Sequence, residues 1–295
     1  MILGVVAISF SPLVVKMVSF SPTVSAFYRS LYATIFLFMW SGLRFKGELG
    51  RRNLRWYAPI LIAGVSLGID FILWHKTIFY LGAGPATFLG NSQVIFVTIF
   101  AALMFKERIP FSFIIYLVVI LVGLYLLMPA LVNTVNRPLG YIYGMIVGIT
   151  YAIMLIGMRY AKSKAGENYP ELFSLAVLFL ASTAVIGLHL LFVVPEPLLV
   201  PDVRSHLLMA ITSLFAQAIG WYLIKTNITK IPAHEGSLFL ILQPILAMAW
   251  GHIFFSEPVT MVQLTGIIMA SGGIVLFLWK KGCWDARWID KSHCC

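Results

Sequence analysis

Ten long apolar stretches run through the 295-residue chain, and they constrain its fold more than any other feature. A bilayer span requires about 20 mostly apolar residues, so ten spans occupy roughly 200 residues and leave only short loops. Only 11% of the residues are charged and the mean hydropathy is +0.94, whereas a soluble domain carries about 25% charged residues. This composition excludes a disordered chain, an ordinary nucleic-acid binder and a conventional soluble enzyme. We therefore predict an all-α membrane protein with ten transmembrane helices.

Charged residues and prolines mark the limits of the ten stretches. The fourth, fifth and tenth stretches contain no Asp, Glu, Lys or Arg. The predicted spans are Ile2–Val18, Thr23–Leu43, Tyr57–Phe79, Pro85–Phe105, Phe111–Met128, Leu139–Met158, Glu171–Val194, His206–Ile224, Ala233–Phe255 and Val259–Trp279.

Lysines and arginines are distributed unevenly among the predicted loops. Sixteen of the 21 follow even-numbered spans, including Lys225, and only Arg137 and Arg204 follow odd-numbered spans. Cytoplasmic loops of membrane proteins carry the excess of Lys and Arg. We therefore expect both termini on the cytoplasmic side of the cytoplasmic (inner) membrane. The same asymmetry accounts for the net charge of +10 without a nucleic-acid partner.

The sequence contains an internal duplication. Similar residues recur in the same order at a shift of 147 positions, and later at a shift of 150. The first copy covers residues 1–128 and the second residues 139–279, and a cytoplasmic tail, 280–295, follows. Each copy has five predicted spans, so the second copy must enter the membrane from the opposite side, as in inverted-repeat transporters. The matches are Asp70/Gln217, Trp74/Trp221, Pro85/Pro232, Gln93/Gln243, Glu107/Glu257 and Gly123/Gly273.

Three segments give the chain a family resemblance. SPTVSAFYRSLYA, GAGPATFLGNSQVIFVTIFAALMFKERI and IPAHEGSLFLILQPILAMAWGHIFFSEPVT resemble the EamA domains of the drug/metabolite transporter superfamily. The resemblance extends over nearly the whole chain. It implies two five-helix repeats, each with an acidic residue that closes its fourth helix. Glu107 and Glu257 hold that position here, and we interpret them as gate or packing residues.

Ionisable residues inside predicted spans are the sharpest indication of a site, because a charge at the bilayer centre is costly. Asp70 and Trp74 share one helix face at a spacing of i, i+4, and Gln217 and Trp221 repeat this pair. We expect these four residues to line one cavity for a substrate. The alternative is that Asp70 pairs with Arg29 or Lys16 while the tryptophans only pack.

The first copy supplies the candidate ionic groups. Arg29 and Lys16 are candidates to clamp an anionic group, since an arginine offers a bidentate fork to a carboxylate; alternatively, Arg29 extends toward the interface. Asp70 and His75 are candidates for proton coupling, since histidine titrates near neutrality. A lone membrane histidine can instead satisfy a carbonyl or a neighbouring carboxylate.

The remaining candidates are amides and a phenol. Gln93 and Gln243 occupy matched positions, where they can brace a helix or contact a substrate, and Tyr222 follows Trp221. The stretches Gly64–Gly68 and Gly140–Gly148 place small residues on one helix face, which favours close helix packing.

These patterns predict a transporter and not an enzyme. The sequence has no G-x-x-x-x-G-K-[ST], no H-E-x-x-H and no clustered metal ligands, so we expect no ATP motor, metal or cofactor. We predict a secondary or facilitative carrier, monomeric or homodimeric, that moves a small amino-acid-like or amphipathic metabolite, as an exporter, by alternating access. The alternatives are a membrane-embedded lipid-modifying enzyme and a channel or receptor.

Overall fold

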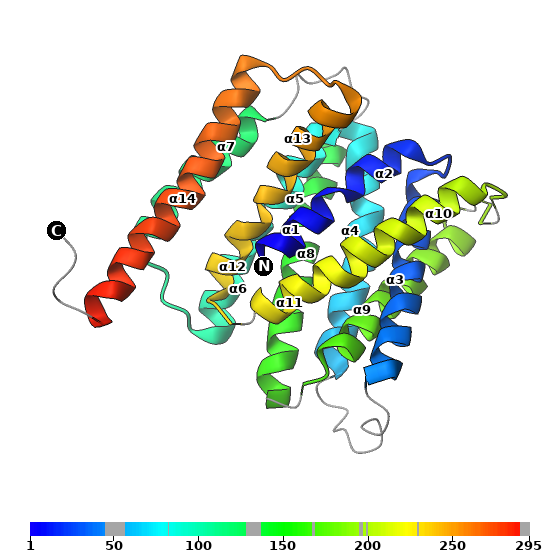
Figure 1. Cartoon of the computed structure of the whole chain (residues 1–295), viewed down its shortest axis with the longest axis horizontal. Helices are drawn as coiled ribbons and strands as arrows, with labels where there is room; N and C mark the ends of the chain where they lie inside the picture. The colour runs from blue at the N-terminus through cyan, green and yellow to red at the C-terminus, as the bar shows by residue number, and fades with distance from the viewer. Residues whose placement is uncertain are drawn as a thin grey trace.

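The computed structural model describes residues 1–44, 57–81, 83–127, 137–166, 169–194, 197–198, 200–228 and 230–289. All regular elements in these ranges are helices, with no strand among them, so the predicted all-α class is confirmed (Figure 1). The helices are α1 (Ile2–Ser9), α2 (Ser11–Met17), α3 (Pro22–Arg44), α4 (Tyr57–Leu81), α5 (Ala83–Asn91), α6 (Gln93–Phe105), α7 (Phe111–Leu126), α8 (Arg137–Ala165), α9 (Glu171–Phe192), α10 (Val203–Thr212), the π-helix η4 (Ser213–Gly220), α11 (Trp221–Ile228), α12 (Ala233–Leu240), α13 (Leu242–Phe255) and α14 (Met261–Ile289).

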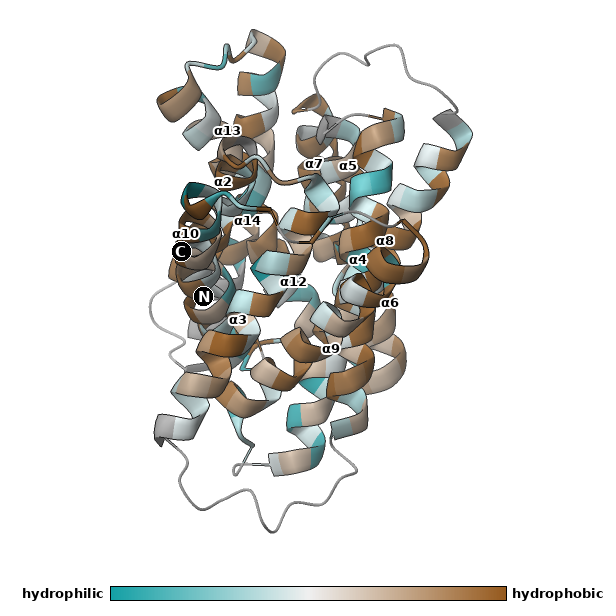
Figure 2. Ribbon diagram, turned by 90° about the vertical axis from the view of Figure 1, so that its right-hand side faces the viewer, coloured by the Kyte–Doolittle hydropathy of each residue, from teal (hydrophilic) through white to brown (hydrophobic). Residues whose placement is uncertain are grey.

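Seven helical segments within the described ranges are long and apolar enough to cross a membrane, and Ile2–Val15 and Phe111–Leu126 are shorter apolar helices. Figure 2 shows hydrophobic residues along most of the helices. Large apolar side chains such as Phe79, Phe192 and Met261 are mostly exposed. Apolar surface on this scale is typical of contact with a membrane, so the chain is a multi-pass membrane protein.

Two helices, α11 and α14, extend beyond the ends of the predicted spans. Helix α11 continues to Ile228 and carries Lys225, a residue that the sequence pattern assigns to a loop. In the structure Lys225 is completely buried. Its Nζ bonds to the Glu171 carbonyl oxygen at 2.9 Å and to the Ser174 hydroxyl, and these partners allow a charged side chain to stay inside the bundle. Helix α14 extends through Ile289 into the predicted tail, and 290–295 lie outside the described residues.

Four of the predicted spans are interrupted. The first breaks at Phe10, the fourth at Ser92 and the ninth at Ile241, while the eighth passes through the π-helix η4. Pro12 and Pro244 explain two of the breaks, because a proline has no N–H to donate to the carbonyl four residues earlier. A π-helical turn inside an α-helix frequently marks a functional site.

The duplication is visible in the backbone. Lys106 and Ser256, 150 positions apart, end α6 and α13 with φ of 54° and 53°. They are the two non-glycine residues with positive φ in the described ranges. After each of them a glutamate N–H donates to a carbonyl six residues earlier at 3.3 Å, in the pairs Glu107–Ala101 and Glu257–Gly251. Both copies therefore close this helix with the same turn.

Glycines permit the close helix crossings that position the interior. A Cβ atom on Gly64 would collide with the Leu178 carbonyl oxygen of α9, and one on Gly144 would collide with Leu89 of α5. A Cβ on Gly123 of α7 would lie 2.6 Å from the Ala270 nitrogen of α14. The predicted role of the small-residue faces in helix packing is confirmed.

Candidate functional site

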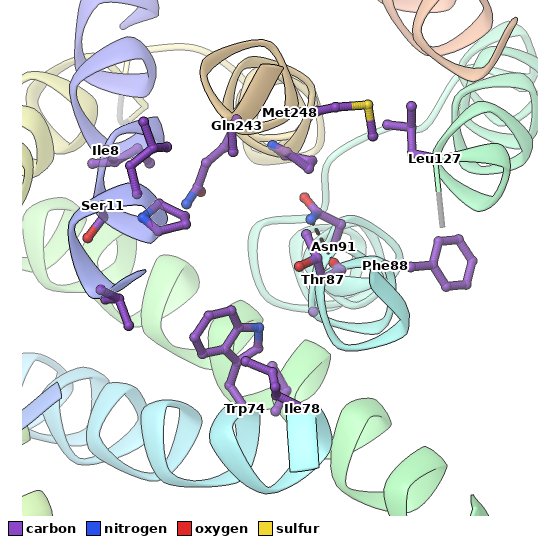
Figure 3. Close-up of a pocket in the computed structure, with 18 of the residues that line it drawn as sticks. Ile8, Ser11, Trp74, Ile78, Thr87, Phe88, Asn91, Leu127, Gln243 and Met248 are labelled. Atoms are coloured by element: carbon purple, nitrogen blue, oxygen red, sulfur yellow. Dashed lines mark hydrogen bonds between the residues drawn. The ribbon is translucent and has the colours of Figure 1, made fainter. Parts of the chain in front are cut away.

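A cavity of about 740 Å³ lies between helices of the two copies. This volume is within the range of pockets for small organic ligands, about 300–1,000 Å³. Its walls come from α1 to α5, α7, α8, η4, α11, α13 and the start of α14. Figure 3 shows Trp74 of α4 facing this space, with Gln243 of α13 on the opposite wall and Ser11 of α2 to one side.

The structure brings eight of the predicted residues to this one cavity and leaves others away from it. The eight that line it are Arg29, Asp70, Trp74, His75, Gln217, Trp221, Gln243 and Glu257. Tyr222 packs against Trp40 with 5.1 Å between the ring centroids, and Glu107 belongs to a separate cluster described below. The side chain of Lys16 lies outside the described residues.

Gln93 and Gln243 match in the sequence but differ in their surroundings. Gln93 is completely buried, and its Nε2 donates to the Ser237 carbonyl oxygen of α12 at 3.4 Å. Gln243 instead lines the cavity near the break between α12 and α13. Asn91, at the corresponding break of the first copy, faces the same space, and its Nδ2 donates to the Thr87 carbonyl oxygen at 2.8 Å (Figure 3).

Two opposite charges line the cavity without forming an ion pair. The Asp70 carboxylate accepts a hydrogen bond of 3.1 Å from Thr150 Oγ1 of α8. Arg29 donates from Nη1 to Ser11 Oγ at 3.1 Å, and its guanidinium carbon lies 4.2 Å from the Phe71 ring centroid. Among the described side chains no cationic nitrogen lies within 4.0 Å of Asp70. The two charges are therefore held apart by neutral partners.

Several polar atoms on the cavity wall have no hydrogen-bond partner among the described residues. Gln217, on the π-helix, donates from Nε2 to Ser11 Oγ at 3.3 Å. Its Oε1, the Arg29 Nε and the His75 Nδ1 are buried without a hydrogen-bond partner among the described residues. Buried polar atoms in proteins are nearly always paired. These three atoms therefore lack the pairing that buried polar groups usually have.

Aromatic rings form the apolar part of the wall. Trp74 packs edge-on to His75 with 5.2 Å between centroids, and Trp221 packs edge-on to Tyr151 at 6.1 Å. Indole rings offer a flat apolar surface and one N–H donor. The arrangement suits an amphipathic organic molecule.

Sequence reasoning missed Ser11, Thr150 and Tyr151. Ser11 precedes Pro12, and a proline inside an apolar stretch is a signal for a helix break next to it. Thr150 and Tyr151 lie within an apolar span, and an isolated hydroxyl there gives no sequence signal of the direction in which it points.

Glu107 lies in a polar cluster at one end of the bundle. Its carboxylate accepts hydrogen bonds from the Ala233 backbone N–H at 2.9 and 3.1 Å, and it lies 2.7 Å from His234 Nδ1 and 3.1 Å from Arg159 Nη2. Burial raises the pKa of the Glu107 carboxyl, but the bonds from Ala233 and His234 and the charge of Arg159 outweigh burial and hold it below its ordinary value. Glu107 therefore joins the end of α6 to α8 and to the start of α12.

A second polar cluster ties α2 and α3 to the start of α10. Asp202 caps α10 by accepting from the Arg204 and Ser205 backbone N–H groups, and it also accepts from the Ser19 and Ser205 hydroxyls. The hydrogen bonds from these two hydroxyls lower the pKa of Asp202 to about 2. Nearby, Tyr32 Oη lies 2.8 Å from His206 Nδ1.

Comparisons with known proteins agree with this architecture. The model of the EamA-like transporter family matches residues 1–128 and 138–279. An uncharacterized transporter of Archaeoglobus fulgidus is 24% identical over 75% of this chain and 76% of its own length. The pseudopaline exporter CntI of Pseudomonas aeruginosa is 23% identical over 87% of this chain and 86% of its own length. A solved crystal structure superimposes with a TM-score of 0.77 over 94% of this chain and 95% of that chain at 15% identity, which shows a shared fold.

Proposed function

The chain belongs to the EamA-like transporter family and is a small-molecule membrane transporter, and we propose that its central cavity carries the substrate by alternating access between two inverted halves. The halves are residues 1–128 and 139–279. Inverted repeats with a site near the midplane are typical of secondary transporters. We propose that the protein lies in the cytoplasmic membrane and that both termini are on the cytoplasmic side.

Ten spans are required for this arrangement. Seven segments meet the length and hydropathy of a span, and Ile2–Val15 and Phe111–Leu126 are shorter apolar helices. We assign α3 as the tenth span, since its 23 residues match a span in length and its buried Arg29 faces the cavity and not lipid. Five spans in each half give the halves opposite orientations.

The observation that carries the proposal is that matched residues of both halves line one cavity. Asp70 and Trp74 come from α4, whereas Gln217 and Trp221 come from the corresponding span of the second half. A cavity shared by equivalent helices can open toward either side when one half rocks against the other.

The wall indicates the class of substrate. Two indoles supply apolar surface, and Arg29 and Asp70 supply one charge of each sign. We propose an amphipathic, amino-acid-like metabolite. Export is the proposed direction, because a relative of similar length is named as an exporter. Asp70 and His75 are the proposed residues for proton coupling.

The cavity extends toward one end of the bundle. Its lining includes Glu257, Pro258 and Gln263 beyond α13, together with Pro22 and Leu127, but not Glu107. We propose that the Glu107 cluster is a closed gate on the cytoplasmic side and that Glu257 lies at the open, outer side.

Counterflow in proteoliposomes tests the proposed substrate site. Purified protein is reconstituted with internal L-phenylalanine, L-tryptophan, L-leucine or L-glutamate, and entry of the same labelled amino acid is measured. We expect Trp74→Ala and Trp221→Ala to lower counterflow by about tenfold, as for the loss of roughly 1.5 kcal/mol of aromatic contact. The matched control is Trp279→Ala, an indole that is 70% exposed on α14. Equal counterflow in all three variants, or none with any amino acid in the wild type, would contradict the proposal.

A further inference from the structure

We infer that Ser11 is a specificity-determining residue that aims Arg29 and Gln217 at a carboxylate group of the substrate. The inference rests on the proposed function, because it assigns the chemistry of one wall of the proposed substrate cavity. It adds a residue that sequence patterns did not single out and a ligand group that this residue selects.

The break between α1 and α2 fixes the position of Ser11. The Phe10 ring stacks on Trp250 of α13 with centroids 4.5 Å apart and an angle of 19° between the planes. Trp250 Nε1 also donates to Ser9 Oγ at 2.9 Å. The break is thus anchored to the second half at both residues that precede Ser11.

Ser11 then joins two further helices. Its hydroxyl oxygen accepts from Arg29 Nη1 of α3 at 3.1 Å and from Gln217 Nε2 of η4 at 3.3 Å. A hydroxyl oxygen has two acceptor positions, so these two bonds fill it. Ser11 is itself 4% exposed, and water has little access to compete for the same atom.

Both donors keep polar atoms that no described residue pairs. With Nη1 bound to Ser11, the Nε and Nη2 groups of Arg29 make no hydrogen bond to any described residue. Arg29 is 8% exposed and Gln217 is 3% exposed, and the Gln217 Oε1 has no partner among the described residues. Both side chains line the cavity.

These atoms match a carboxylate. The Nε and Nη2 donors of an arginine lie side by side in one plane and bind both oxygens of a carboxylate. The Arg29 guanidinium group lies over the Phe71 ring, and Ser11 accepts a hydrogen bond from its Nη1, so the group has two protein contacts before a ligand arrives. Gln217 Oε1 offers an acceptor to an N–H or O–H group next to that carboxylate.

Binding of three matched probes tests this inference. The probes are 3-phenylpropanoate, its neutral amide 3-phenylpropanamide and the cation phenethylamine, measured by calorimetry on purified full-length protein. We expect the wild type to prefer the carboxylate over the amide by about tenfold or more, as for a hydrogen bond to a charged group. Ser11→Ala is expected to reduce that preference to about twofold or less, since the guanidinium loses its fixed partner.

Three variants separate recognition from folding. Ser11→Thr keeps the hydroxyl and is expected to keep the preference. Ser11→Cys keeps the size but supplies a weaker acceptor, and it is expected to lose the preference even if Ser11→Ala does not fold. Ser41→Ala is the matched control, because Ser41 is also 4% exposed but, among the described residues, its hydroxyl donates to the Phe38 carbonyl of its own helix.

The outcomes distinguish this inference from the proposed function. A preference kept in Ser11→Ala and Ser11→Cys, or a wild type that binds the amide, the amine or no probe as well as the carboxylate, overturns the role of Ser11. Failure of the proposed function appears separately, as absence of counterflow in wild-type proteoliposomes. Loss of the preference in Ser11→Ala and Ser11→Cys alone supports the inference.

Discussion

The two turns that end α6 and α13 have the same backbone but different surroundings. Lys106 and Ser256 both adopt the left-handed conformation, and Glu107 and Glu257 both donate their N–H to a carbonyl six residues earlier. Glu107 contacts Ala233, His234 and Arg159 away from the cavity, whereas Glu257 lines the cavity. The two copies thus share the backbone of this turn, whereas the side chains around the turn differ between the copies.

The two ends also differ in the contacts that join their helices. At the Glu107 end, one carboxylate joins α6, α8 and α12, so these helices cannot separate without breaking all three contacts. At the Glu257 end, the same turn faces open space.

The largest effect is expected from Glu107→Ala. Removing one partner of a mostly buried ion pair costs about 3 kcal/mol, and the side chains of Glu107 and Arg159 are 12% and 20% exposed. We expect a fall in Tm of several degrees and a strong loss of counterflow, because the closed end loses its three contacts. The matched control is Glu257→Ala, for which we expect a smaller fall in Tm. Equal effects of the two substitutions would show that the two ends do not differ.

The pH dependence of stability tests whether the charge of Glu107 stabilises its end of the bundle. The pKa of Glu107 is lower in the folded protein than its ordinary value, so its stabilising contribution is complete above the ordinary glutamate pKa of about 4.3. That contribution is lost as the pH falls through the lowered value. The difference in Tm between wild type and Glu107→Gln should therefore be largest near neutral pH and shrink below about pH 4. A difference that stays constant with pH would rule out this electrostatic account of the closed end.

A smaller effect is expected from Asp202→Ala in the second polar cluster. Asp202 is half-buried at the surface, and it caps α10 while it accepts a bond from the Ser19 hydroxyl. We expect a small decrease in Tm, less than that of Glu107→Ala, because exposed interactions contribute little. The pKa of Asp202 is about 2, so the decrease should persist to more acidic pH than that of Glu107→Gln. A Tm loss equal to that of Glu107→Ala would contradict this order.

The sequence predicted most of the helices and most of the candidate residues that line the cavity. Apolar stretches between charged breaks predicted the helices, since lipid requires long apolar segments with internally paired backbones. The i, i+4 spacing of Asp70 and Trp74 predicted their common face, and both line the cavity.

The direction of the other side chains depends on how each helix is rotated about its axis. An apolar pattern does not predict this rotation when all sides of a helix are apolar. Gln93 turns to the Ser237 carbonyl while its counterpart Gln243 faces the cavity. The π-helix that carries Gln217 and the burial of Lys225 also left no signal in composition. Ser11 acquires its role only from partners that are 18 and 206 positions away.

Labelling of cysteines from the two sides of the membrane tests most directly whether the halves are inverted. The native cysteines are Cys283, Cys294 and Cys295, and in a variant without them Asn133→Cys places a single thiol in the segment that links the two halves. In intact cells, a membrane-impermeant maleimide should label Asn133→Cys at once, and it should label the native tail cysteines of the otherwise unchanged chain only after permeabilisation. Labelling of both positions from the same side would mean that the second half crosses the membrane an even number of times. Since the two halves are copies of one unit, the inverted arrangement would then be wrong.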